Sequence, residues 1–444
     1  MVRPNTPEGL CLRCKGSRNL CGKNPCPILA KHAVLKSIKF PTDLVEKGRS
    51  MANFDIESAS PPAFFVGHNG YPKVSIGPML PYSPARSLDS PIEVNAMDTP
   101  EQWLVPGSPE ETHKTLMDVV QFRSSLIRTT HPLNVKSWNN DKILDLSQQI
   151  AMAEKPVGTE IEVEKLHVNV QIDDHAAPNG PSGSIQKLAI TENPKVHKNV
   201  DYVVSDTDLK ASEAITKYLY TDGHIPVSDI YRILSAGLLG LEDNRKLVPT
   251  RWAITATDDT ISKRLITRIK TFPELGEYLL YESSYLGNSF HVILAPRPWC
   301  YEMMESWAPA SIWRLFDRDQ TYVIMEDYEM ADGRTTYASN ITGAYYSARL
   351  GVCEQLVAMQ RQAAAIVIRE VNEQYLMPLG VWVIRQAVRD AMAKKPARYS
   401  SFKEIFAYLK PNLQVPLSNW LRKSQLLPYI RSQTTLESFL TRDS

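Results

Sequence analysis

The sequence lacks the features that mark secreted or membrane proteins. Its longest run of apolar residues, 363–368, is bounded by Arg361 and Arg369 and is far too short to span a bilayer. The first residues, MVRPNTPEG, lack the apolar segment of a secretory signal. Only Cys300 and Cys353 stand outside the first 26 residues, so a disulfide framework is not expected. We therefore expect a cytoplasmic protein in a reducing compartment, with no membrane partner.

Signature motifs of common enzyme classes are also missing. The chain contains no Walker loop, no G-x-G-x-x-G, no H-E-x-x-H and no G-x-S-x-G. It shows neither an internal repeat nor the regular strand–helix alternation of a Rossmann sheet. The sequence thus leaves open whether the protein is catalytic.

Positive and negative charges nearly cancel over the whole chain but are unevenly distributed along it. The formal net charge is only +1, yet residues 1–50 carry 10 Lys and Arg against 3 Asp and Glu, and residues 394–444 carry 9 against 3. Residues 51–393 therefore have a net charge of −12. Basic ends around an acidic body are typical of a protein that binds nucleic acid near its ends, although both ends being merely solvated is the alternative.

Length and composition predict a globular protein of two or three domains, since 444 residues with 43% hydrophobic content can bury a substantial core. The predicted class is mixed α+β, with long helices in the C-terminal third and a flexible C-terminal tail. The expected segments are a cysteine module at 1–30, a Pro-rich and helical region at 31–150, a central mixed α/β domain at 151–342, a helical region at 343–425 and a tail at 426–444.

Local patterns predict individual elements. PAFFVGHNGYPKVSIGP predicts two short strands around the turn His68-Asn69-Gly70. A helix is expected from Pro109 to about Thr129, and residues 160–173 alternate as a strand. KLAIT and DYVVS predict strands, followed by a helix through Tyr220 that Asp206 or Asp208 would cap.

The second half is predicted to be strand-rich and then helical. Strands are expected in LVPTRWAITA, EYLLYESSYLGNSFHVILAPRPW and TYVIMEDYE. Residues 343–393 repeat apolar side chains at three- and four-residue steps, which predicts the longest helical stretch, broken or kinked at Pro378.

Four cysteines cluster at the N-terminus with the spacing Cys-x2-Cys-x6-Cys-x4-Cys: Cys11, Cys14, Cys21 and Cys26. Four thiolates this close, among glycine, proline and basic residues, suit a tetrahedral zinc site, and a fully protein-ligated site is structural rather than catalytic. The alternatives are two disulfides or an iron–sulfur cluster, but the spacing matches no common ferredoxin pattern.

The last dozen residues carry an apolar triad with no core in which to bury it. Gln433, Leu436 and Phe439 are three residues apart, and Leu440 adds a second apolar side chain. In a 3₁₀ turn these residues share one face. The pattern resembles the PIP box, the peptide by which replication and repair proteins bind the DNA sliding clamp, PCNA. Leu440 departs from the usual form, in which a second aromatic stands there. The alternative is a short terminal helix packed on the body.

A set of polar and aromatic residues in the middle of the chain is predicted to line one cleft for a nucleotide or a DNA phosphate. Arginine beside tryptophan is typical of single-strand and flipped-base sites, and paired carboxylates would hold a second divalent metal ion. The alternative is that the tryptophans are core and Arg251 is a buried partner of an acid. The candidates are His68, Lys73, Arg251, Trp252, His291, Arg297, Trp299, Asp327 and Glu329.

Several stretches together resemble the archaeal Nre DNA-repair family across essentially the whole chain. They are the cysteine cluster, FFVGHNGYPKVSIGP, VVSDTDLKASEAITKYLY with LSAGLLG, RKLVPTRWAITATDDTISKRL, the helix start at Tyr345-Tyr346-Ser-Ala-Arg349, PLGVW and the terminal peptide. The resemblance implies participation in DNA-damage repair together with the sliding clamp, and supplies no catalytic mechanism.

The leading hypothesis is therefore a clamp-docked DNA-repair factor with a structural zinc module, which binds or processes damaged DNA. Two alternatives remain: a non-catalytic adaptor bound to the clamp, and a metal-dependent nuclease or nucleotide hydrolase that uses the acidic centre. They differ in whether Asp, Glu and His side chains converge on a metal ion or a phosphate.

Overall fold

The computed structural model describes residues 53–81, 99–136, 141–168, 180–308 and 322–432, and the single residues 14, 20, 29, 33, 44 and 46. The chain forms two compact units built from interleaved segments. Unit 1 comprises Met1–Ala33, Leu104–His113 and Ser262–Ser444, and unit 2 comprises Val34–Trp103 and Lys114–Ile261. The sequence predicted consecutive segments and contained no sign of this interleaving.

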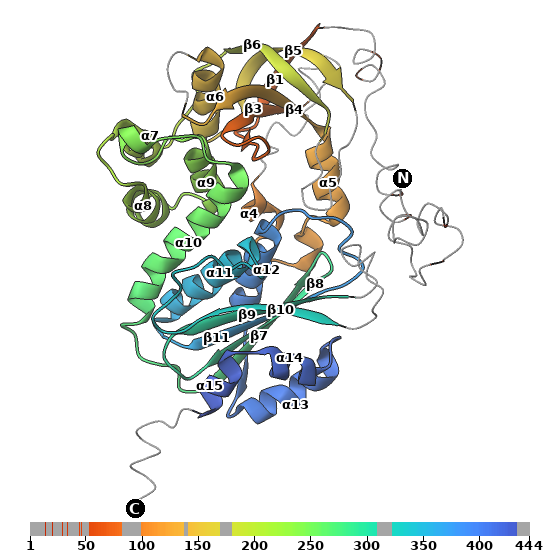
Figure 1. The fold of residues 1–444 in the computed structure, drawn as a ribbon, viewed down its shortest axis with the longest axis vertical. Coiled ribbons are helices and arrows are strands. Elements are labelled where there is room, and N and C mark those ends of the chain that lie inside the picture. The colour runs from red at the N-terminus through yellow and green to blue at the C-terminus, as the bar shows by residue number, and fades with distance from the viewer. Residues whose placement is uncertain are drawn as a thin grey trace, which may run out of the picture. The chain divides into compact units, whose positions relative to one another are not determined.

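Unit 2 is built on a six-stranded sheet in the order β1-β5-β6-β4-β3-β2 (Figure 1). All neighbouring pairs are antiparallel except β4 and β6, which are parallel. The strands are β1 (Asn53–Ser60), β2 (Phe64–Val66), β3 (Lys73–Pro81), β4 (Leu126–Asn134), β5 (Val157–His167) and β6 (Ser182–Ile190).

Alternation along these strands buries one face of the sheet. Ile56, Leu80, Ile127, Ile161 and Leu188 belong to one apolar cluster, against which α6 packs Ile150. The helices of the unit are α4 (Pro100–Trp103), α5 (Leu116–Ser125), α6 (Lys142–Met152), α7 (Lys198–Ser205), α8 (Ala211–Glu213), a π-helix (Ala214–Asp222), α9 (Val227–Ser235) and a 3₁₀ turn (Glu242–Asn244). Helix α10 (Thr250–Ile269) begins in unit 2 and ends in unit 1.

Unit 1 contains a second six-stranded sheet, in the order β10-β9-β11-β8-β7-β12. The pair β9 and β11 is parallel and the other pairs are antiparallel. The strands are β7 (Tyr278–Tyr285), β8 (Asn288–Ala295), β9 (Cys300–Trp307), β10 (Val323–Glu329), β11 (Ala364–Val371) and β12 (Ala397–Tyr399).

Helices cover both faces of this sheet (Figure 1). One face meets the pair α11 and α12, and the other packs Ile293, Met304 and Ile366 against Trp420 and Ile430 of the C-terminal helices. The helices of the unit are a 3₁₀ turn (Glu110–Thr112), α11 (Gly343–Met359), α12 (Trp382–Ala393), α13 (Phe402–Asn412), α14 (Leu417–Lys423) and α15 (Leu426–Ser432).

The mixed α/β class and the predicted hairpin are confirmed. Strands β2 and β3 pair antiparallel, with Phe64 opposite Pro78, on either side of the turn at 68–70. Strand β5 accounts for the predicted strand at 160–173, although it ends at His167.

The predicted strand LVPTRWAITA is wrong, because it forms the start of α10, a helix of 20 residues. Its threonines, isoleucines and tryptophan favour strands only weakly, and tertiary packing overrides such a preference. DYVVS is likewise helical, in α7, where the His197 side chain accepts a hydrogen bond from the backbone N–H of Asn199.

The helical stretch predicted for 343–393, broken or kinked at Pro378, is wrong in its middle. Between α11 and α12 the chain forms β11, which lies between β8 and β9 and is buried at all eight positions. A strand covered on both faces is a continuous apolar run, and such a run is not distinguishable from a helix by periodicity alone.

Two smaller expectations fail at element boundaries. The helix expected from Pro109 to about Thr129 is a 3₁₀ turn followed by α5, and β4 begins at Leu126. Lys210, rather than Asp206 or Asp208, precedes α8, and no side chain caps that helix. The Asp206 carboxylate instead accepts the Asp208 backbone N–H in a turn.

The two terminal motifs lie largely outside the described residues. Of the cysteine cluster the structure describes Cys14, which is buried, and the clamp motif at 433–440 falls wholly outside. Among the helices that the structure describes, none has both the length and the apolar character needed to cross a membrane.

Candidate nucleic-acid interface

The hairpin of unit 2 presents polar side chains at its tip. Its turn is closed by hydrogen bonds from Gly67 N to Ser75 O (2.9 Å) and from Lys73 N to Gly70 O (2.9 Å). Gly70 has φ +84°, in the left-handed region that a side chain would disfavour. His68 and Lys73 are exposed at this tip.

The Thr250 hydroxyl joins the hairpin to the first residue of α10. It accepts a hydrogen bond from Val66 N (2.9 Å) and lies 3.1 Å from the Ser235 hydroxyl. Ser235 uses its single proton on Val248 O (2.7 Å), so Thr250 must donate to Ser235. The hairpin, the end of α9 and the start of α10 are therefore held at one point.

This junction places two aromatic rings side by side on the surface. The centroids of Tyr71 and Trp252 are 5.0 Å apart with the rings inclined at 58°, and the two residues are 44% and 46% exposed. The other tryptophans that the structure describes are buried or half-buried. An exposed aromatic pair is a stacking face for a planar ligand.

Basic residues neighbour the pair along the chain and across the strands. Arg251 precedes Trp252 on α10, and Lys73 follows Tyr71 by two residues; both are exposed. Lys73 lies opposite Asn134 across β3 and β4, and the exposed Lys136 follows Asn134 by two residues. The backbone N–H of Leu247 donates to Val135 O, which brings Lys246 to the same region. A stacking face with a cationic rim is typical of single-strand nucleic-acid binding.

Two groups of predicted cleft residues are thus brought together in unit 2: His68 and Lys73 of the hairpin, and Arg251 and Trp252 of α10. The other candidates, His291, Arg297, Trp299, Asp327 and Glu329, lie in unit 1. That all of them line one cleft stays a prediction.

Within unit 1, three of these candidates have local partners. His291 Nδ1 lies 2.7 Å from Glu282 Oε1, and the Arg297 guanidinium donates to Pro296 O at 2.9 Å. Trp299 is 1% exposed and stacks on Tyr301, with centroids 6.1 Å apart. Trp299 is therefore a core residue, whereas Trp252 is not.

Both predicted acids of unit 1 are engaged by arginine. Asp327 accepts the backbone N–H groups of Asn340 (2.9 Å) and Ile341 (2.8 Å) and pairs with Arg334 at 3.0 Å. Glu329 pairs with Arg349 at 2.6 Å and accepts from the Tyr345 hydroxyl at 3.1 Å. In the described ranges, no three His, Cys, Asp or Glu side chains are arranged to hold a metal ion.

The pKa values around Glu329 do not indicate an activated nucleophile. Burial raises the pKa of Tyr301 and of Tyr345 well above the usual value. Burial, with Glu302 and Glu329 nearby, raises the pKa of the Cys300 thiol to about 12, and burial also raises that of Cys353. These groups stay protonated at neutral pH and are therefore weak nucleophiles.

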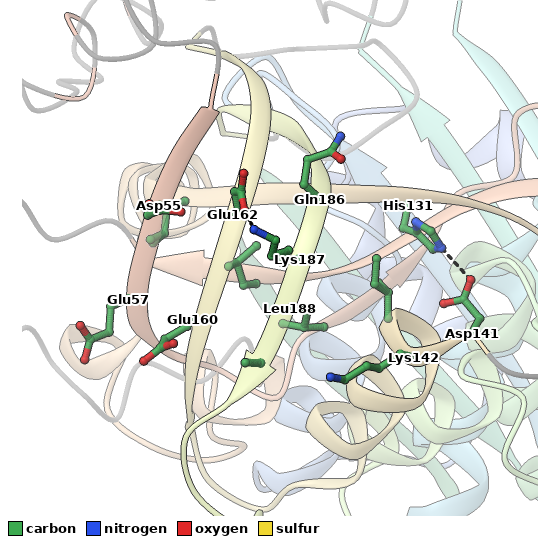
Figure 2. Close-up of a pocket in the computed structure, with 14 residues that line it drawn as sticks. Asp55, Glu57, His131, Asp141, Lys142, Glu160, Glu162, Gln186, Lys187 and Leu188 are labelled. Carbon is green, nitrogen blue, oxygen red and sulfur yellow. Dashed lines mark hydrogen bonds and ion pairs between the residues drawn. The ribbon is translucent and has the colours of Figure 1, made fainter.

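A separate open groove of about 970 Å³ lies on the sheet of unit 2 near α6 (Figure 2). Carboxylates dominate its lining: Asp55, Glu57, Glu160 and Glu162 on β1 and β5. Lys187 pairs with Glu162 at 2.7 Å. An acidic groove repels phosphate, so we do not place the nucleic-acid interface here. The alternating glutamates of EIEVEK are the only sequence signal of it.

His131 and Asp141 close the other end of this groove, with Nε2 and Oδ2 2.8 Å apart (Figure 2). Burial alone would raise the pKa of Asp141, but hydrogen bonds from His131 and from the backbone of Leu144 outweigh it and lower that pKa. Because the Leu144 bond caps α6, the pair has a structural role.

Comparison with known proteins defines the class to which this fold belongs. Residues 20–314 match the family model described as "Archaeal Nre, N-terminal", and residues 329–439 match "Archaeal Nre, C-terminal". No solved structure matches the chain.

Three curated relatives are similar over most of their length. "DNA repair protein NreB" of Archaeoglobus fulgidus is 35% identical over 428 residues, 96% of this chain and 99% of the relative. "DNA repair protein NreA" of the same organism is 33% identical over 434 residues, 97% and 98%. "DNA repair protein NreA" of Haloferax volcanii is 37% identical over 372 residues, 82% and 84%. The chain therefore belongs to the archaeal Nre family, as the sequence motifs predicted.

Proposed function

We propose that the protein is a DNA-repair factor that docks on the sliding clamp through residues 433–440 and binds DNA at the surface around Tyr71 and Trp252. The observation that carries the repair role is the match, over 82–97% of this chain, with three relatives named DNA repair proteins. The DNA surface is supported by the exposed aromatic pair and its basic rim in unit 2.

The clamp hook is supported by the sequence Gln433 to Leu440, which follows directly on α15. We expect a peptide of residues 430–444 to bind the organism's own clamp in the micromolar range. Each buried apolar side chain contributes roughly 1.5–3 kcal/mol, from which ordering costs are subtracted. Phe439→Ala should weaken binding more than Gln433→Ala, because an aromatic anchor in a desolvated pocket is a hot spot.

The full-length protein supplies the control for this experiment. A chain that ends at Ser432 keeps α15 complete and should lose clamp binding by calorimetry. Undiminished binding of the shortened chain would show that the tail is not the hook.

Trp252→Ala tests the DNA surface. Loss of one stacking face should weaken binding to a short oligothymidylate by roughly 1–3 kcal/mol. The melting temperature should hardly change, because Trp252 is 46% exposed. Tyr328→Ala, which removes an exposed aromatic from β10 of unit 1, is the matched control. Equal affinities of both variants and the wild type, measured by fluorescence anisotropy, would refute a role for Trp252.

A structural zinc ion held by Cys11, Cys14, Cys21 and Cys26 is part of the proposal. Its support is the donor set, since four thiolates complete a tetrahedral site without a water ligand. Metal analysis of reduced, chelator-free protein should give about one zinc per chain, and metal-free protein would end this part of the proposal.

A non-catalytic adaptor is the second candidate function. It is favoured by the pairing of Asp327 and Glu329 with Arg334 and Arg349, since a metal ion at either acid would have to displace an arginine. Cleavage of a damaged duplex by the purified protein with a divalent metal would instead support the nuclease alternative.

A further inference from the structure

One face of the sheet in unit 2 carries partly exposed side chains where β2, β3 and β4 run side by side. Alternate residues point to opposite faces of a strand. On β4, Ile127 and Thr129 are buried, whereas Arg128 between them is partly exposed. Phe65 on β2 is flanked by the buried Phe64 and Val66 and is also partly exposed.

Arg128 reaches across this face to Phe65. Its guanidinium carbon lies 3.9 Å from the centroid of the Phe65 ring, well inside the range of cation–π contacts. Gly77, on the intervening strand β3, is opposite Phe65, and a Cβ atom there would clash with Thr129 of β4. Stacking of this kind fixes the plane of the guanidinium and leaves its N–H edge for other partners.

That edge has no partner in the part of the chain that the structure describes. No carboxylate pairs with Arg128, and no acceptor takes its side-chain N–H groups. Its nitrogens are not among the fully buried polar atoms that lack a partner, so solvent reaches them. Burial lowers the pKa of Arg128 with no acid to offset it.

Other buried arginines that the structure describes have the acceptors that Arg128 lacks. The Arg232 side chain, 8% exposed, pairs with Asp229 at 2.7 Å, and Arg369, 3% exposed, pairs with Glu305 at 2.8 Å. Burial also lowers the pKa of Arg245, but Arg245 donates to three backbone carbonyls. A stacked, half-buried arginine without an anion is unusual among them, because removing a cation from water is costly unless an acceptor compensates.

Gly67 lies next to the guanidinium. A Cβ atom on Gly67 would lie 3.9 Å from Arg128 Nη2 and 3.6 Å from Ser75 O, ordinary contact distances. A side chain at position 67 could therefore approach Arg128 without a clash. The exposed Lys73, two residues before Ser75 on β3, adds a second positive charge along the same strand.

We propose that Arg128, oriented by Phe65, is a binding site for a phosphate group. The planar fork of arginine matches two phosphate oxygens through parallel charge-assisted hydrogen bonds, and among the described residues no acid pairs with Arg128 or raises its pKa. The phosphate can belong to a DNA backbone, in which case the site extends the proposed DNA surface and rests on it, or to a free nucleotide.

Two variants test the site in the full-length protein. Arg128→Gln removes the charge. Gly67→Asp adds a carboxylate beside Arg128 Nη2, which would pair with the guanidinium and compete with a phosphate. The new Cβ atom fits without a clash. Both should weaken binding to a short oligothymidylate about tenfold or more, the range of a lost charged hydrogen bond. Both should also reduce the slope of log affinity against log salt by roughly 0.7.

The readouts separate a ligand site from a structural cation. Gly67→Asp should keep or raise the melting temperature and weaken binding to the oligothymidylate. If Arg128 had only a structural role, the affinity would not fall. Arg264→Gln, an exposed arginine on α10, is the control of equal charge change. Unchanged affinity and salt slope in both test variants would overturn the proposal.

Inorganic phosphate and a mononucleotide distinguish the two sources of the group. If the wild type binds inorganic phosphate or the mononucleotide by calorimetry and Arg128→Gln does not, the phosphate site is supported. If DNA does not bind in that case, only the proposed DNA surface is refuted. Binding of DNA that depends on Trp252 but not on Arg128 or Gly67 would leave the DNA surface standing and refute the phosphate site.

Discussion

Arg349→Met is expected to lower the free energy of unfolding of unit 1 by about 3–5 kcal/mol, the largest effect of any single substitution considered. Arg349 and Glu329 are 2.6 Å apart, and their side chains are only 2% and 1% exposed. Removal of the cation leaves the Glu329 carboxylate buried without a counter-charge, with the Tyr345 hydroxyl as its remaining donor. Urea unfolding followed by circular dichroism measures the loss.

A double variant shows whether the loss comes from the orphaned charge. Arg349→Met combined with Glu329→Leu replaces the pair by apolar groups and should recover most of the stability, since such replacements of buried pairs are often neutral. If Glu329 instead served a ligand cleft, Glu329→Leu alone would leave unfolding unchanged and abolish ligand binding. A double variant less stable than Arg349→Met would contradict the expected compensation.

Glu302 should make unit 1 less stable as the pH rises towards neutrality. This carboxyl is fully buried and accepts hydrogen bonds from the Ser424 hydroxyl and from Gln425 N (2.6 Å). Burial raises its pKa from 4.5 to about 7, although those hydrogen bonds act in the opposite direction. The folded state therefore holds a proton that the unfolded state has already lost between these two pKa values.

The sign follows from the raised pKa. The stabilising contribution is complete below the unfolded pKa of 4.5 and is lost as the pH rises through about 7, with a total of roughly 3 kcal/mol. Glu302→Gln should remove this dependence, so the difference in unfolding free energy between variant and wild type should change between about pH 4.5 and pH 7. Glu277→Gln, at a more exposed acid, is the control. Parallel pH profiles of Glu302→Gln and the wild type would refute the assignment.

The parts of the fold that the sequence predicted are those with strong local signals. The turn at His68 to Gly70 combines a glycine at positive φ with flanking apolar strands, and the hairpin follows from these features alone. Strand β11 and helix α10 were mispredicted because their identity depends on distant neighbours. The first is a strand because β8 and β9 flank it. The second keeps a helical backbone despite several β-branched residues.

The candidate site was predictable to the same extent. Arg251 and Trp252 were recognisable as a cation beside an aromatic, and the structure adds Tyr71 as the partner ring. Arg128 had no signal, because it fell within the helix predicted from Pro109 to about Thr129 and its contact with Phe65 joins residues 63 positions apart. The buried pairing of Glu329 with Arg349 was equally invisible, since the two lie on different elements.

If a clamp binds residues 433–440 as proposed, the packing of α15 limits the length of the link between unit 1 and that clamp. Ile430 is 1% exposed within the apolar cluster under the sheet, so the chain is anchored only three residues before Gln433. Three fully extended residues span at most about 10 Å. A clamp bound through Gln433 would therefore hold unit 1 close to the clamp surface, through a short link rather than a long flexible linker. Lengthening that short link should therefore loosen the position of the repair factor on the clamp while leaving the affinity of the hook unchanged.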